Sequence, residues 1–488
     1  MTCDLLEVGV DKPESARAGG IVGVLAFAGI TAAIMQTVVI PLIAQFPQLL
    51  HTTASNASWV VTSTLLVAAV ATPVAGRLGD LYGKRRVLLL STVPLIAGSV
   101  VCAVSSSVLP MIVGRGLQGM GVGIVPIGIS LMRDVLPAER LGAAVALLSA
   151  SLGIGAAFGL PVSSAVAEYS NWRVLFWASA VLCALIAVAI WVVVPDSPIK
   201  ASGSFDIVGA LGLGAGLVCL LLAVSKGAAW GWGSGTILAL FAAAIVLLLV
   251  WGWWELRIAD PLVDLRVTAQ PPVLLTNAAS LVVGVAMYAA MLTVPQLLQA
   301  PTVTGYGLGQ SMMAMGLWMA PSGLMMMVIS PMGARLSAVR GPKVTLIAGG
   351  LVIALGYGAS TVLMGSTWGL LISLCIINSG VGLAYGAMPA LIMAAVPLSE
   401  TASANSFNTL MRSVGTSFSA AVIGVVLAQM SMTVGGHSIP TEDGFRTSLF
   451  LGCGVALVAA AVAATIPVRR AVSAGSSEDA EKLVAEHV

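Results

Sequence analysis

Long apolar runs alternate with short polar segments along nearly the whole chain. A helix that crosses the roughly 30 Å hydrocarbon core of a bilayer needs about 20 apolar residues. Fourteen runs approach or exceed this length, so the pattern predicts an all-α integral membrane protein with about 14 transmembrane helices. The predicted spans are residues 21–45, 57–78, 86–105, 109–133, 142–166, 174–195, 206–225, 236–256, 273–298, 311–334, 344–364, 368–394, 402–430 and 446–467.

The composition supports lipid as the main solvent. Hydrophobic residues make up 58% of the 488 residues and charged residues only 9%, whereas a soluble domain carries roughly 25% charged residues. A net charge of +2 gives no reason to expect a nucleic-acid partner. The six cysteines are scattered, and the three histidines fall in loops or the C-terminal tail. We therefore predict no disulfide framework, no metal site and no cofactor.

The distribution of Lys and Arg predicts the orientation of the spans. If the N-terminus is cytoplasmic, 17 of the 22 Lys and Arg residues lie on the cytoplasmic side. Only Arg173, Lys226 and Arg446 lie outside, and Arg115 and Arg412 fall within spans. We therefore expect a multi-pass protein of the cell membrane with both termini cytoplasmic, including polar tails at residues 1–18 and 471–488.

The chain contains an internal repeat. The segment 76–85 after the second span resembles the segment 334–343 after the tenth, at an offset of 258 residues. The segments 136–155 and 396–415 repeat at an offset of 260 residues. Parallel repeats of this kind are a known transporter architecture. We expect two six-helix bundles, residues 19–195 and 267–470, joined by two linking transmembrane helices within residues 196–266, a 6+2+6 arrangement.

The segment between the second and third spans reads Gly76-Arg-Leu-Gly-Asp-Leu-Tyr-Gly-Lys-Arg-Arg86. It resembles the G-x-L-x-D-x-x-G-[RK]-[RK] signature loop of the major facilitator superfamily. Gly114-Arg-Gly-Leu-Gln-Gly119 resembles the R-x-x-x-G motif of the same superfamily, and Gly155-x-x-x-Gly159 with Pro161 resembles the glycine-proline motif of its antiporters. The fourteen predicted spans are typical of its drug:proton antiporter branch.

The resemblance implies that the signature loop acts as a latch that holds the cytoplasmic side closed. Gly76 and Gly83 permit a tight turn, and the Asp80 carboxylate can pair with arginines or cap a helix N-terminus. An alternative is an ordinary cytoplasmic loop with a turn glycine and positive charges. The residues predicted to form the latch and to carry coupling are Gly76, Asp80, Gly83, Arg85, Arg133 and Asp134.

Two arginines fall within predicted spans. An intramembrane arginine costs at least ~2.5–3.5 kcal/mol and generally faces a water-filled cavity. Arg115 and Arg412 are therefore interpreted as cavity residues that contact substrate, although bonds to backbone carbonyls or neighbouring amides are an alternative. Gly155, Gly159 and Pro161 are predicted helix-packing residues. The predicted substrate-binding residues are Gln36, Arg115, Gln118, Tyr288, Trp318, Asn378, Tyr385, Asn408 and Arg412.

Eight of the 21 methionines lie between Met312 and Met332. Methionine is flexible and polarizable, so such a run can form an adaptable wall of a binding site. The interpretation we favour from the sequence is simpler: these side chains fill lipid-facing or core positions.

The spans contain no Asp or Glu at mid-depth. Many relatives in the superfamily carry an aspartate in the first span at the position that Met35 occupies here. Arginine stays protonated at physiological pH and cannot carry a proton cycle. Any proton coupling is expected to run through Asp80, Asp134, Glu139 or Glu400, above all Asp134 beside Arg133; otherwise the protein behaves nearly as a uniporter.

These observations predict a secondary transporter rather than an enzyme, since no nucleophile, histidine or metal constellation is visible. We expect it to export amphipathic or hydrophobic small molecules, neutral or anionic rather than cationic, with a proton gradient as the driving force. Residues 20–195 would rock against 270–467. Two alternatives are a dedicated exporter of one metabolite or antibiotic and a non-transporting sensor or assembly subunit. Nothing in the sequence requires more than a monomer.

Overall fold

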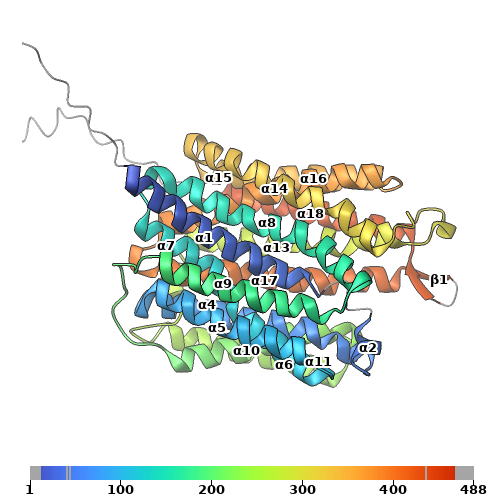
Figure 1. Cartoon of the computed structure of the whole chain (residues 1–488), viewed down its shortest axis with the longest axis horizontal. Helices are drawn as coiled ribbons and strands as arrows, with labels where there is room; N and C mark the ends of the chain where they lie inside the picture. The colour runs from blue at the N-terminus through green and yellow to red at the C-terminus, as the bar shows by residue number, and fades with distance from the viewer. Residues whose placement is uncertain (1–11, 40–41, 43–44, 435–436, 468–488) are drawn as a thin grey trace, which may run out of the picture.

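The structure is a computed structural model that describes residues 12–39, 42, 45–434 and 437–467. Its helices run side by side along one long axis, and a small two-stranded hairpin projects at one end (Figure 1). Of the two predicted tails, residues 1–11 and 471–488 lie outside the described residues. Residues 12–18 belong to the first helix.

In the described part of the first half, six helical segments are long and apolar enough to cross a membrane. The fourth span contains a short 3₁₀ turn, Met120–Gly123, between two α-helices. The helices are α1 (Lys12–Thr37), α2 (Phe46–Leu49), α3 (Ala54–Ala57), α4 (Trp59–Tyr82), α5 (Lys84–Val104), α6 (Val108–Gly119), α7 (Ile124–Val135), α8 (Ala138–Tyr169) and α9 (Arg173–Val193).

Two further long helices precede the second half, in which the long helices again alternate in direction. The linking helices are α10 (Ile207–Trp230) and α11 (Gly235–Glu255). The elements that follow are α12 (Leu265–Thr268), α13 (Pro271–Gln299), α14 (Met312–Arg340), α15 (Pro342–Leu363), α16 (Thr367–Ala395), α17 (Thr401–Gln429), β1 (Ser431–Val434), β2 (His437–Pro440) and α18 (Glu442–Thr465). Short 3₁₀ turns lie at Thr302–Thr304 and Leu398–Glu400.

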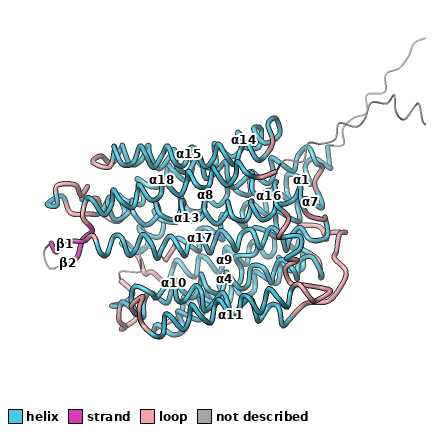
Figure 2. The backbone as a smooth tube through the Cα atoms, turned by 180° about the vertical axis from the view of Figure 1, so that it is seen from behind, coloured by secondary structure: helices cyan, strands magenta, loops and turns pink. Residues whose placement is uncertain are grey.

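The prediction of an all-α membrane protein is confirmed. Among the described residues, fourteen helical segments, with α6 and α7 counted as one, are long and apolar enough to cross a membrane. They correspond one to one to the fourteen predicted runs, and Figure 2 shows that helix dominates the backbone.

Two details of the prediction are wrong. The first predicted span extends to residue 45, whereas α1 ends at Thr37. The apolar side chains beyond it are used differently: Val39, Leu42 and Phe46 are buried in a cluster that includes Trp172. The β1–β2 hairpin, which pairs Ser431 with Pro440, was not predicted because only four residues form each strand.

The bundle has two ends, which we name by their contents. The Asp80 end holds the α4–α5 turn, the α9–α10 and α11–α13 connections and the start of α17, while the hairpin end holds β1 and β2. Figures 1 and 2 show the start of α1 and the hairpin at opposite ends. The Lys and Arg distribution predicts that the Asp80 end is cytoplasmic.

Cysteine labelling tests this orientation. We expect Asn56→Cys, in the exposed connection before α4, to react with a membrane-impermeant maleimide on intact cells. Ser202→Cys, in the exposed connection before α10, should react only after the cells are permeabilised. The parent protein, with its accessible native cysteines replaced by serine, is the control. The reverse labelling pattern would show that the orientation is inverted.

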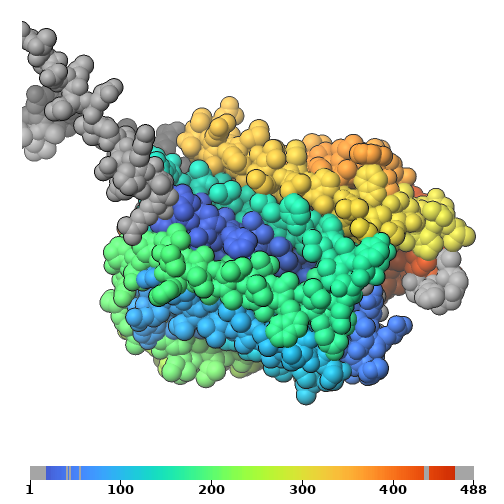
Figure 3. Space-filling view, in the orientation of Figure 1, coloured from blue at the N-terminus to red at the C-terminus, as the bar shows by residue number. Residues whose placement is uncertain are grey.

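The two halves meet along α4–α17 and α8–α14. Figure 3 shows the yellow C-terminal half lying against the blue-green N-terminal half. The backbones approach closely at Gly153 and Gly323: a Cβ atom on Gly323 would lie 2.5 Å from the carbonyl oxygen of Gly153. Small residues therefore allow α8 and α14 to pack tightly across the two halves.

The linking helix α10 packs against both α4 and α17. Leu213 and Leu217 of α10 share a buried cluster with Leu66 of α4 and with Phe407 and Leu410 of α17. The linking helices lie at the edge of the bundle in Figures 1 and 2. The helix α10 therefore covers the line along which α4 meets α17.

Candidate functional site

A central cavity of about 300 Å³ lies between the two halves. Its walls come from α1, α4, α6, α7, α8 and the 3₁₀ turn Met120–Gly123 on one side and from α13, α14, α16 and α17 on the other. Most of the lining is apolar. The polar lining residues are Gln36, Thr37, Thr64, Arg115, Tyr288, Ser322, Asn378, Tyr385, Thr409, Arg412, Ser413 and Thr416. Among the described lining residues, Arg115 and Arg412 alone carry charge.

Six of the nine predicted substrate-binding residues line this cavity. They come from five different helices and so could be brought together only by the tertiary fold. The six are Gln36, Arg115, Tyr288, Asn378, Tyr385 and Arg412. Their contact with substrate stays a prediction, but their placement makes the cavity the candidate binding site.

The structure does not bring the other three to the cavity. Each is instead engaged by a neighbouring polar side chain: Gln118 donates to the Ser99 hydroxyl at 2.8 Å, and Trp318 donates to the Gln310 amide oxygen at 3.1 Å. Asn408 donates to an amide oxygen of α13 at 2.9 Å. A polar side chain within a span needs a partner, and here the partners lie in the protein.

The Arg115 side chain links three helices. Its Nη1 donates to the Met35 carbonyl oxygen at 3.0 Å and to the Gln118 amide oxygen at 2.6 Å. Its Nε donates to the Val60 carbonyl oxygen at 3.4 Å. Only 2% of Arg115 is exposed. The guanidinium therefore holds α1 and α4 to α6 through carbonyl and amide oxygens, as the structural alternative predicts.

The Arg412 side chain is held differently. Its guanidinium carbon lies 4.4 Å from the centroid of the Tyr385 ring, which is a cation–π arrangement. Within the described part of the chain, no acceptor forms a hydrogen bond or ion pair with this guanidinium. The Tyr385 hydroxyl donates to the Met287 sulfur at 3.0 Å. The five donors of Arg412 are thus available at the cavity.

The methionine run of α14 serves two purposes. Met319 and Met326 line the cavity, as do Met287 and Met291 of α13. Met332, by contrast, is 57% exposed on the outside of the bundle. The favoured interpretation, lipid-facing or core filling, therefore holds for part of the run only.

Asp80 connects the two halves at one end of the bundle. Its buried carboxylate accepts hydrogen bonds from the backbone N–H of Ala402 at 3.1 Å and of Ser403 at 2.7 Å. The Ser403 hydroxyl donates to it at 2.9 Å. These donors lie in the first turn of α17, where the helix dipole favours an anion. A carboxylate of the N-terminal half thus caps a helix of the C-terminal half.

Lys84 completes the charge balance of this cap. Its Nζ lies 2.5 Å from Asp134 Oδ2 and 3.9 Å from Asp80 Oδ1, and the three side chains are fully buried. The Ser197 hydroxyl also donates to Asp134, at 2.5 Å. Asp134, predicted to act beside Arg133, is therefore paired with Lys84. Lys84 was not among the residues predicted from the sequence, although its spacing of four residues from Asp80 was a usable signal.

Two further residues that were predicted to form the latch hold α4 and α7 against the C-terminal half. Arg133 Nη1 donates to the Thr401 hydroxyl at 2.8 Å. A Cβ atom on Gly76 would lie 2.4 Å from the Ser406 hydroxyl oxygen and 2.7 Å from the Ala402 carbonyl oxygen, so glycine permits the contact between α4 and α17. With Asp80, these contacts join the two halves of the chain at the Asp80 end.

Gly83 and Arg85 act within the N-terminal half. Gly83 has a φ of +103° in the turn between α4 and α5, a conformation that favours glycine. Arg85 lies 3.3 Å from Asp196 and donates to the Trp191 carbonyl oxygen at 2.6 Å. The two residues shape and fasten the loop, and neither reaches the C-terminal half through these contacts.

The predicted packing residues lie on two faces of α8. Cβ atoms on Gly155 and Gly159 would lie 2.4 Å from the Ala33 side chain and 2.0 Å from the Thr37 hydroxyl, so both glycines face α1. Pro161 lies against Gly316 of α14.

A buried acidic pair in the linking helices was not singled out from the sequence. Asp206 accepts hydrogen bonds from the Gly209 N–H at 2.8 Å and from the Trp254 indole at 3.0 Å. Glu255 accepts from the Val263 N–H at 3.4 Å. Both residues lie at the ends of spans, where acidic residues are common, so their burial left no signal in the sequence.

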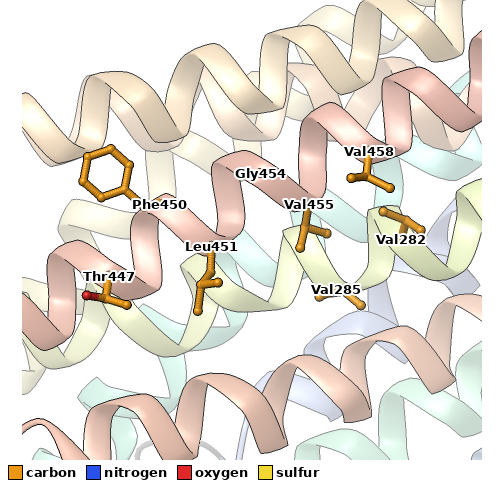
Figure 4. Close-up of a pocket in the computed structure, with 8 residues that line it drawn as sticks. All are labelled: Val282, Val285, Thr447, Phe450, Leu451, Gly454, Val455 and Val458. Carbon is orange, nitrogen blue, oxygen red and sulfur yellow. The ribbon is translucent and has the colours of Figure 1, made fainter.

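A second hollow of about 540 Å³ lies between α13 and α18. Figure 4 shows that it is bordered by Val282 and Val285 on one helix and by Leu451, Val455 and neighbouring residues on the other. Among the described residues that line it, Thr447 alone has a polar side chain. Because this groove lies within the C-terminal half and is almost entirely apolar, the central cavity is the better candidate site.

Comparison with known proteins agrees with this architecture. The family model described as Major Facilitator Superfamily matches residues 25–420. An uncharacterized MFS-type transporter of Mycobacterium tuberculosis (strain ATCC 25618 / H37Rv) is 30% identical over 429 residues, which are 85% of this chain and 61% of that protein. The chain thus spans less than two thirds of that relative's length.

Two further matches are informative. The multidrug resistance protein Stp of M. tuberculosis (strain CDC 1551 / Oshkosh) is 29% identical over 392 residues, 78% of this chain and 70% of Stp. The structure of the proton:xylose symporter XylE superimposes with a TM-score of 0.64 at 12% identity, over 93% of this chain and 97% of XylE, a likeness that shows the fold alone. This chain therefore belongs to the major facilitator superfamily, and its fourteen spans and its relatives are consistent with the drug:proton antiporter branch.

Proposed function

We propose that this protein exports amphipathic or hydrophobic small molecules from the cytoplasm, as a secondary transporter of the multidrug type. The observation that carries the proposal is a mostly apolar cavity between two halves that are capped together at one end by Asp80. A relative named as a multidrug resistance protein supports export as the direction. In this proposal the Asp80 end faces the cytoplasm of the cell whose membrane holds the protein.

The latch supplies the physical basis for alternating access. While Asp80 caps α17, the cytoplasmic end is closed, so the conformation described here would release substrate outward. Reopening this end requires the carboxylate to leave the two N–H groups of Ala402 and Ser403. Hydrogen bonds to a charged group contribute roughly 1.5–3 kcal/mol each. The two together cost roughly 3–6 kcal/mol to break, which is small enough to be overcome repeatedly in a transport cycle.

We propose that proton coupling, where present, uses the buried cluster of Asp80, Lys84 and Asp134. Two carboxylates share one lysine in this cluster. A proton added to either carboxylate therefore changes the net charge of the cluster and weakens the electrostatic interactions that hold the end closed. Glu139, considered from the sequence, is exposed beyond the start of α8 and is a weaker candidate.

Flux in proteoliposomes tests both proposals. With the protein reconstituted, a pH gradient should drive net movement of amphipathic compounds from the Asp80 end to the hairpin end. Protein-free liposomes are the first control. Absence of flux for every compound in a panel of neutral, anionic and cationic amphiphiles, by a correctly folded protein, would refute the export function.

Replacing Asp134 with asparagine should separate coupling from transport. The amide can still accept hydrogen bonds from Lys84 and Ser197, but it cannot bind and release a proton. We expect gradient-driven accumulation to fall about tenfold while exchange of substrate at equal pH continues, a change of about 1.4 kcal/mol. Glu139→Gln, at the same end of the bundle, is the matched control and should keep full accumulation. Equal accumulation by Asp134→Asn and wild type would exclude Asp134 as the coupling group.

A further inference from the structure

Arg412 is fixed in position at about half the depth of the bundle. It lies 11 residues after the first residue of α17, or about 17 Å along the helix axis. α13 packs closely behind it, because a Cβ atom on Gly284 would lie 2.4 Å from the Arg412 carbonyl oxygen and 3.2 Å from its Cγ. The stem of the side chain is therefore held between helices, and the guanidinium lies on the Tyr385 ring at the cavity.

The two cavity arginines differ in what they can offer a ligand. Arg115 already donates to Met35, Val60 and Gln118 and is 2% exposed. Arg412 makes a cation–π contact but donates to no acceptor in the described residues. Neither has a carboxylate partner within the described lining. The cavity thus carries two uncompensated positive charges. Within the described residues, Arg115 already uses its Nε and Nη1 atoms to bind protein oxygens, whereas none of the donors of Arg412 is engaged in this way.

The surroundings of Arg412 favour a flat ligand. Tyr385 supports one face of the guanidinium, so its planar fork of N–H groups is restricted in orientation. Tyr288 and four methionines, Met287, Met291, Met319 and Met326, line the same cavity. Thioether sulfurs pack favourably against aromatic rings. The volume of about 300 Å³ lies at the small end of the range for ligand pockets.

We infer that Arg412 is the anion-recognition residue of the cavity, and that the ligand is a compact, planar aromatic molecule with one negatively charged oxygen group. A carboxylate or an ionised phenol would accept hydrogen bonds from the guanidinium while its rings lie against the methionine and tyrosine side chains. Arg115, in this assignment, positions helices and does not touch the ligand. The inference rests on the proposed export function and adds its substrate class.

Two matched dyes test the charge preference directly. Fluorescein methyl ester is a xanthene monoanion at slightly alkaline pH, and the corresponding rhodamine methyl ester has the same three-ring frame with one positive charge. Binding to the purified full-length protein can be measured by fluorescence polarisation. We expect wild type to bind the anion at least about tenfold more tightly than the cation.

Variants of Arg412 assign this preference to the residue. Arg412→Gln should weaken binding of the anion about tenfold or more and leave binding of the cation unchanged or stronger. Arg412→Lys should keep part of the preference, because the charge stays and the bidentate fork is lost. Arg446→Gln, an exposed arginine of α18 outside the cavity lining, is the matched control and should behave as wild type.

Three results would overturn the inference. They are equal binding of both dyes by wild type, equal weakening of both dyes in Arg412→Gln, and binding of neither dye by folded protein. If Arg412→Gln fails to fold, Arg412→Lys provides the comparison. Anion binding with the expected dependence but without flux of any compound would refute export and leave this inference standing. Flux without an anion preference would support export and refute the assignment of Arg412 as the anion-recognition residue.

Discussion

Replacing Asp80 with asparagine should slow transport by about one to two orders of magnitude while substrate affinity stays within about threefold of wild type. The carboxylate holds the first turn of α17 through Ala402 and Ser403 and lies outside the described lining of the cavity. Loss of one charge-assisted interaction, roughly 1.5–3 kcal/mol, shifts the equilibrium toward an open Asp80 end by about ten- to a hundredfold. Substrate flux and equilibrium binding measured on the same preparation test this.

The control for Asp80→Asn is Glu139→Gln, an exposed carboxylate at the same end. It removes a negative charge from the region without touching the α4–α17 contact. If Asp80→Asn abolished binding and left the transport rate of bound substrate unchanged, Asp80 would belong to the binding site, and the latch would have to be assigned elsewhere.

Replacing Gly76 with alanine should have a comparably large effect by a different route. The new methyl carbon would lie 2.4 Å from the Ser406 hydroxyl oxygen and 2.7 Å from the Ala402 carbonyl oxygen in the closed conformation. The backbone of α17 must then move away, so the closed Asp80 end is destabilised. We expect transport to fall about five- to a hundredfold, since inserting a methyl group into a close-packed interior costs roughly 1–3 kcal/mol.

Gly79→Ala provides a matched control one turn along the same helix. A Cβ atom on Gly79 would meet no atom closer than 3.7 Å, and alanine has the higher intrinsic helix propensity. Flux should therefore stay within about twofold of wild type. Equal losses in Gly76→Ala and Gly79→Ala would show that the close contact of α4 with α17 is not what limits transport.

The sequence was sufficient to predict the helices because each span is a local feature. Twenty apolar residues must form a helix in lipid wherever they occur, since backbone groups have no water to bind there. The β1–β2 hairpin and the early end of α1 lie at the hairpin end, outside the spans, where this constraint does not act.

The partners of polar side chains were harder to predict, because they come from distant parts of the chain. Asp80 and Ser403 are 323 residues apart. The sequence of the signature loop alone does not indicate which helix Asp80 caps. Gln118 and Asn408 were predicted to line the cavity because each has an amide side chain within a span. They instead satisfy neighbouring polar groups on packed helices.

The most direct test of the account measures distances at both ends of the bundle during the transport cycle. Spin labels at exposed positions 86 and 339 report on the Asp80 end, and labels at 171 and 303 report on the hairpin end. Pulsed electron paramagnetic resonance then measures the distance between the two labels of each pair, with and without substrate and a pH gradient. Rocking around the cavity predicts that one distance increases while the other decreases, and that Asp80→Asn shifts the population toward a longer 86–339 distance. Two distances that stay fixed, or that lengthen together, would contradict alternating access by rocking of the two halves.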